Sequence, residues 1–186
     1  MKSLKITSLL SLLFIFASCS DDDDVKLINE EEVITTLTVT LVDNATNQTK
    51  TFQSRDLDGD GPESPVITAD NLDANTTYQG SILFLNELED PAENITLEVV
   101  EEGAEHQVFF VSATSLQTTF TYEDADANNN PIGVDFTLTT GEASSGNLSI
   151  ILVHDGDKFA EGAAAGDPSN VGGETDIGAT FPITIQ

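Results

Sequence analysis

The sequence predicts an all-β protein, an antiparallel β-sandwich of roughly eight to nine strands. Short runs in which apolar and polar residues alternate recur along the chain, as in 134–139 and 148–153. A period of two residues is typical of strands with one buried face. Gly, Pro, Asn and Asp separate these runs, and no long run has the apolar spacing of an amphipathic helix.

The individual strands are expected in a simple order. The first, 33–42, is rich in β-branched residues and places Leu37, Val39 and Leu41 on one face. Further strands are expected at 49–53, 66–68, 78–85, 95–100, 107–112, 118–122, 134–139, 148–153 and 181–185. Pro182 cannot donate to a ladder, so the last strand is expected at a sheet edge. Segment 160–166 is expected to contain one helical turn.

The N-terminus has the pattern of an export signal. Lys2 and Lys5 precede an apolar stretch over 9–16, and small residues follow it. The apolar stretch is too short to span a bilayer, which needs about 20 residues. We therefore predict a cleaved signal peptide over 1–18.

The residues around Cys19 resemble the lipobox of bacterial lipoproteins, here Phe-Ala-Ser-Cys over 16–19. The four Asp residues at 21–24 resemble the surface-export signal of lipoproteins in the Bacteroidota. This resemblance implies lipidation of Cys19 and a lipid anchor in the outer membrane that faces outward. The alternatives are an ordinary signal peptide with an incidental Cys, and an acidic run that is only a solvated spacer. Residues 19–32 are expected to form a disordered acidic tether, and 33–186 the sandwich domain.

Acidic residues dominate the charge balance, with 33 Asp and Glu against six Lys and Arg. Loss of Lys2 and Lys5 with the signal peptide takes the formal charge from −27 to −29. Such a chain repels nucleic acid, so no nucleic-acid partner is expected. It favours cations, basic proteins or a salty medium, although solubility alone also explains the charge. The single Cys excludes an intramolecular disulfide.

Segment 72–78, Leu-Asp-Ala-Asn-Thr-Thr-Tyr, resembles the tyrosine corner of fibronectin type III domains, with Ala74 in place of the usual Pro. The resemblance implies an immunoglobulin-like sandwich in which Tyr78 bonds back to the preceding loop. Segments 101–107 and 172–176 also resemble surface lipoproteins of flavobacteria. That resemblance implies a lineage and no activity.

Two sequence motifs are candidates for cation binding. Asp56, Asp58 and Asp60 before Gly61 match the first half of an EF-hand-type calcium loop, but Ile67 stands where the closing Glu belongs. The alternative is a tight acidic turn. Segment 124–128 is a weaker version of the same pattern. Calcium is the only cofactor that these motifs suggest.

The two histidines, His106 and His154, form a second candidate set. With Glu174 or Asp176 they would build a two-His–carboxylate metal site. Hydrogen-bonded histidines at strand ends are the alternative.

No HExxH, GxSxG or phosphate-binding loop is present, so we expect no enzyme. The expected function is a surface-anchored, non-catalytic binding or structural module. The alternative is a glycan or small-ligand capture lipoprotein accessory to nutrient uptake, although Trp, a common sugar-stacking residue, is absent. The sequence identifies no protein or glycan partner.

Overall fold

The computed structural model describes residues 32–59 and 61–186. The predicted signal peptide, Cys19 and most of the predicted tether lie outside these ranges, as does Asp60. The elements, in chain order, are β1 (Thr36–Asp43), β2 (Thr49–Arg55), β3 (Val66–Ala69), β4 (Thr77–Asn86), β5 (Glu93–Asn94), α1 (Thr96–Glu101), β6 (His106–Ser112), β7 (Thr118–Tyr122), β8 (Asp135–Thr140), β9 (Ser144–His154), two 3-10 turns (Ala163–Ala165 and Pro168–Asn170) and β10 (Glu174–Ile185).

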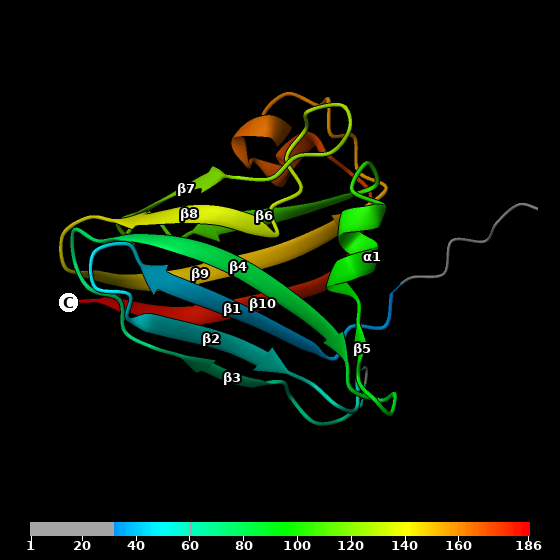
Figure 1. Cartoon of the computed structure of the whole chain (residues 1–186), viewed down its shortest axis with the longest axis horizontal. Coiled ribbons are helices and arrows are strands. Elements are labelled where there is room, and N and C mark those ends of the chain that lie inside the picture. The colour runs from blue at the N-terminus through cyan, green and yellow to red at the C-terminus, as the bar shows by residue number, and fades with distance from the viewer. Residues whose placement is uncertain (1–31, 60) are drawn as a thin grey trace, which may run out of the picture. The chain divides into compact units, whose positions relative to one another are not determined.

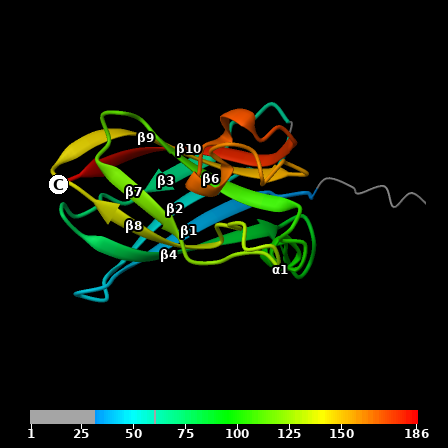
Figure 2. The same ribbon diagram turned by 90° about the horizontal axis from the view of Figure 1, so that it is seen from above.

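The strands form two antiparallel sheets, which confirms the predicted fold class. The larger sheet has the order β3-β2-β1-β4-β8-β7, with β5 beside β4, and the smaller has the order β10-β9-β6. The two sheets overlap in Figure 1, and the view from above separates them into two layers, with β1 and β4 in one and β9 and β10 in the other (Figure 2). β10 is an edge strand of the smaller sheet, so Pro182 lies in an edge strand as predicted, and Ile185 near its end forms a parallel bridge with Leu72.

The hydrophobic core lies between the two layers. Leu37, Val39 and Leu41 of β1 are at most 1% exposed, which confirms their shared inward face. They belong to one buried cluster with Ile150 of β9 and Phe181 of β10. Removal of this apolar surface from water is the main stabilising contribution to such a fold.

The corner before β4 has the hydrogen bonds expected of it. The Tyr78 hydroxyl accepts the Asp73 N–H at 2.9 Å, and it lies 3.2 Å from the Asp73 carboxylate, to which it donates. Tyr78 is fully buried. The side chain therefore fixes the loop that leads into β4, with Ala74 in the place of the proline.

The prediction of a strand over 95–100 is wrong, because this segment is mostly the helix α1. Ile95 and Val99 are buried whereas Leu97 is 69% exposed, so the buried positions repeat every four residues rather than every two. Thr96 Oγ1 accepts the Phe84 N–H at 2.8 Å and fixes the start of the helix against β4. Within the described ranges, no helix combines the length and apolar character needed to cross a bilayer.

Candidate metal centre

Two buried histidines face each other at the end of the smaller sheet. His106, the first residue of β6, is paired directly with His154, the last residue of β9. Their rings stack with centroids 4.5 Å apart, and the side chains are 0% and 6% exposed. Cross-strand neighbours on one face of an antiparallel pair are close enough for their side chains to act together. The pairing of β6 with β9 therefore brings together the only two histidines of the chain.

A β-bulge directs Asp176 into the same place. The register of β10 on β9 passes from Thr175 opposite Val153 to Ile177 opposite Leu152, which leaves Asp176 as the extra residue. Such bulges re-aim a side chain. The buried Asp176 carboxylate lies 3.7 Å from both His106 Nε2 and His154 Nδ1.

Of the two acidic residues expected near the histidines, Asp176 is the one that joins them. Glu174 is paired with His154 in the β9–β10 register, but its residue is exposed. Among the described residues, the ion pairs of the two imidazoles involve Glu32, Glu105 and Asp176 and not Glu174.

Glu32 completes the cluster from the segment before β1. Its side chain is 3% exposed, with Oε1 at 3.0 Å from His106 Nε2 and Oε2 at 3.5 Å from His154 Nδ1. Sequence reasoning placed Glu32 in the tether and missed this role. Only its position directly before the first β-branched run distinguishes it from the other acids of 30–32, and no spacing connects it to the histidines.

The contacts of His106 define which nitrogen faces the cluster. His106 Nδ1 lies 3.3 Å from the carbonyl oxygen of Glu102, which can only accept, so Nδ1 carries the proton. In the neutral ring, Nε2 then presents a lone pair to the Glu32 carboxylate. His106 Nε2 and Glu32 Oε2 are both buried, and neither forms a hydrogen bond within the described residues.

Two buried acceptors at this distance need a cation between them. A lone pair and a carboxylate oxygen repel each other, and an uncompensated buried charge is costly. Either a second proton on the imidazole or a metal ion would supply the positive charge. A single proton on His106 Nε2 would balance one contact only, whereas one ligand atom from each of the four side chains lies within 4.8 Å of the others. The arrangement thus favours a metal ion.

The separations between ligand atoms fit tetrahedral coordination. Zn–N and Zn–O distances of about 2.0–2.2 Å with tetrahedral angles require ligand atoms about 3.3–3.5 Å apart. The closest separations between imidazole nitrogens and carboxylate oxygens are 3.0, 3.5, 3.7 and 3.7 Å. One ligand atom from each of the four residues lies within 4.8 Å of all the others. The two carboxylates also balance the charge of a divalent ion.

Side chains outside the four-residue cluster contact the histidines and fix their orientation. His154 Nε2 lies 3.7 Å from the half-exposed Glu105 carboxylate, which leaves Nδ1 toward the cluster. The buried Lys158 ammonium donates to the backbone carbonyl of His106 at 2.9 Å and pairs with Asp126 at 3.1 Å. Outer partners of this kind fix the orientation of ligating imidazoles and raise their basicity.

No family model, curated protein or solved structure matches this chain. The assignment of the site therefore depends on its own geometry. The side chains of Glu32, His106, His154 and Asp176 are together almost inaccessible to water. Such a closed set of four protein ligands is typical of a binding or structural centre rather than of a catalytic centre with an open position.

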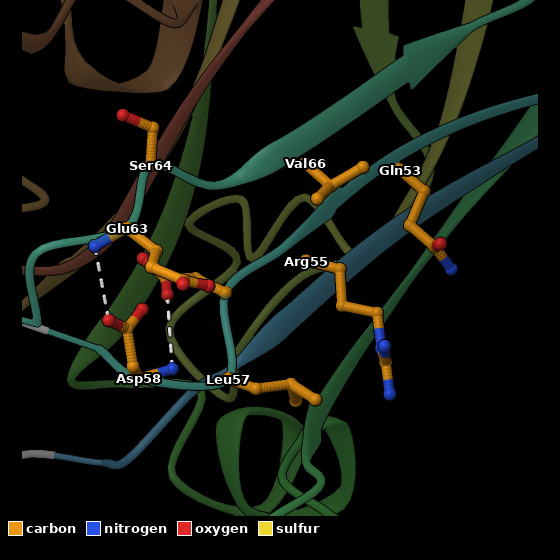
Figure 3. A pocket seen from close by; sticks show the side chains of 8 residues that line it. Gln53, Arg55, Leu57, Asp58, Glu63, Ser64 and Val66 are labelled. Carbon is orange, nitrogen blue, oxygen red and sulfur yellow. Dashed lines mark hydrogen bonds between the residues drawn. The ribbon is translucent and has the colours of Figure 1, made fainter.

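The predicted calcium loop lies elsewhere, between β2 and β3. Asp56 Oδ1 accepts the Asp58 N–H at 3.3 Å, and Asp58 Oδ2 accepts the Glu63 N–H at 3.1 Å (Figure 3). Asp56, Asp58 and Glu63 line a surface pocket of about 510 Å³. Asp60 lies outside the described residues, so calcium at this loop stays a prediction.

The carboxylates of the second acidic segment, 124–128, stabilise the local structure. Asp126 pairs with Lys158, and the Asp124 carboxylate accepts the backbone N–H groups of Gly133, Val134 and Asp135 at 2.7–3.0 Å. Backbone hydrogen bonds thus satisfy the Asp124 carboxylate and shape the loop before β8, and the ion pair with Lys158 holds the Asp126 carboxylate.

The aromatic residues of β6 and β7 form a pair rather than a platform. Phe110 and Phe120 stack with centroids 4.5 Å apart and planes within 4°. Both are half-buried. Their ring faces contact each other, so they are less suited to stacking on a sugar. This geometry does not add support to the glycan-capture alternative.

Proposed function

We propose that this protein is a surface-anchored, non-catalytic lipoprotein module that binds a divalent transition-metal ion through Glu32, His106, His154 and Asp176. The observation that carries the proposal is the buried group of four side chains, in which His106 Nε2 lies 3.0 Å from the Glu32 carboxylate and has no hydrogen-bond partner among the described residues. The likeness of 16–24 to lipoprotein export signals supports the anchor.

The ligand set indicates which ion binds. Imidazole nitrogens suit Zn²⁺, Cu²⁺ and Ni²⁺, whereas Ca²⁺ and Mg²⁺ prefer oxygen ligands alone. Two nitrogens and two oxygens in a tetrahedral arrangement fit Zn²⁺ best. Because all four positions are supplied by protein, water does not complete the shell, and this supports binding rather than hydrolysis.

Zinc binding is tested on purified protein first treated with a chelator. Zn²⁺ should bind stoichiometrically and raise the melting temperature, with about 2.7 kcal/mol of added stability at one hundred times Kd. Calorimetric titration and thermal unfolding measure the two effects. The variant His154→Gln should lose both, since it removes a ligand nitrogen but keeps the size of the side chain. Ca²⁺ at the same concentration should not replace Zn²⁺.

The matched control is Asp58→Ala, which removes an acid of the β2–β3 loop that is not among the four proposed ligands, and this variant should bind Zn²⁺ like the wild type. If zinc stabilises His154→Gln as much as the wild type, the ion binds to the acidic surface in general and the proposed centre is wrong.

A further inference from the structure

A second group of carboxylates lies beside the proposed centre. The helix α1 and its C-terminal end carry Glu98 and Glu102, four residues apart and therefore on one face. One carboxylate oxygen from each of Glu32, Glu98 and Glu102 lies within 4.8 Å of the other two. Figure 1 shows α1 at the end of the sandwich where β10 begins.

These carboxylates lack cationic side chains to balance them. Among the ion pairs of the described residues, no Lys or Arg contacts Glu32, Glu98 or Glu102. Like charges four residues apart destabilise a helix.

Two oxygens of the group are buried without a hydrogen-bond partner in the described part of the protein. They are Glu102 Oε2 and Glu32 Oε2, and the Glu32 side chain is only 3% exposed. An unsatisfied buried carboxylate oxygen is costly, and such groups in a folded protein point to a missing ion or water. Glu32 faces the histidines through both oxygens, and one carboxylate oxygen of Glu32 also lies within 4.8 Å of the Glu98 and Glu102 carboxylates.

We propose that a second divalent cation binds between Glu32, Glu98 and Glu102, and that the Glu32 carboxylate bridges it to the ion held by the histidines. This inference rests on the proposed function. Paired metal ions in proteins lie about 3.5–4 Å apart, a separation that one carboxylate spans. Because the second set contains only oxygens, it suits Mn²⁺ or Mg²⁺ better than the first set does.

The test is a titration of zinc-loaded protein with MnCl₂, followed by electron paramagnetic resonance of free Mn²⁺. We expect one further equivalent of Mn²⁺ to bind to the wild type. The double variant Glu98→Gln/Glu102→Gln should weaken this binding by about tenfold or more, the scale seen for changes around metal centres. Glu101→Gln is the matched control, because Glu101 lies on the same helix but does not belong to this group of carboxylates.

The outcomes separate the two proposals. Unchanged Mn²⁺ affinity in the double variant, or equal loss in Glu101→Gln, would overturn the second site. So would a wild type that binds Zn²⁺ but no further Mn²⁺, and in that case the proposed function stands. Failure of Zn²⁺ itself to bind would overturn both. Retention of Zn²⁺ by the double variant shows that it is folded, and Glu32→Gln should weaken both ions.

Discussion

His106 shows how backbone contacts prepare a side chain for metal binding. The Glu102 carbonyl orients the ring from one side, and the Lys158 ammonium holds the carbonyl of His106 itself. Burial lowers the pKa of Lys158, and its contacts with Asp126 oppose that effect. The imidazole is thus fixed before any ion arrives, which reduces the ordering that binding must impose.

The two tyrosines give a pH-dependent test at the residue scale. Tyr78 and Tyr122 are the only tyrosines of the chain. Burial raises the pKa of both, that of Tyr122 to about 12. Because the folded-state pKa lies above the unfolded value of about 10, their stabilising contribution is complete below about pH 10 and is lost as the pH rises toward 12.

Phenolate absorbance during an alkaline titration measures this effect, with denaturant-unfolded protein as the control. We expect little phenolate in the folded protein at about pH 10, where the unfolded chain is half ionised. About a quarter of the full signal from the folded protein at that pH would show that one of the two hydroxyl groups is solvated, contrary to the structure.

At the scale of elements, the alternation of apolar and polar residues predicted the strands well where one face of the strand is buried. The expected strand 118–122 is β7 residue for residue, and the expected 107–112 differs from β6 by one residue. The helix α1 was missed because six residues with four β-branched or apolar positions fit either period. The bulge at Asp176 was also missed, because nothing in a local sequence shows where a partner strand shifts its register.

Close packing between β4 and β8 gives a test at this scale. A Cβ added to Gly80 of β4 would overlap the Phe136 ring, whereas one added to Gly178 of β10 would lie 3.9 Å from its nearest neighbour. Gly80→Ala should therefore destabilise the protein by about 1–3 kcal/mol through overpacking. Gly178→Ala is the matched control and should change stability little.

Equilibrium unfolding in urea measures both variants. If Gly80→Ala is as stable as the wild type, Phe136 has another position available and the contact between β4 and β8 is looser than the structure shows.

For the whole molecule, the metal centre draws on four distant parts of the chain. Sequence reasoning named His106 and His154 because the chain has only two histidines. It named Asp176 because this acid follows the Gly-Gly turn at 172–173, before the last expected strand. It did not show that they meet, since this depends on the pairing of β6, β9 and β10. It also did not find Glu32, since only the packing of the two sheets brings the start of β1 to the end of β9.

The predicted anchor is tested on whole cells. Cys19→Ala should release the protein from the membrane fraction or leave it unprocessed, because no cysteine remains to be lipidated. External protease should remove the wild type from intact cells, with a periplasmic protein as the control for leakage. A wild type that is cleaved only after lysis would place the protein on the inner side of the outer membrane.

The position of β1 has a mechanical consequence. β1 is paired on both sides, with β2 and with β4, and Glu32 lies just before it. A pull on the chain from its N-terminal side would load both ladders in shear rather than peel an edge strand one bond at a time. An ion on Glu32 would add a cross-link to β6, β9 and β10 ahead of the first ladder bond. The metal-loaded protein should therefore resist such a pull more strongly than the metal-free one, with the load carried first by the ion.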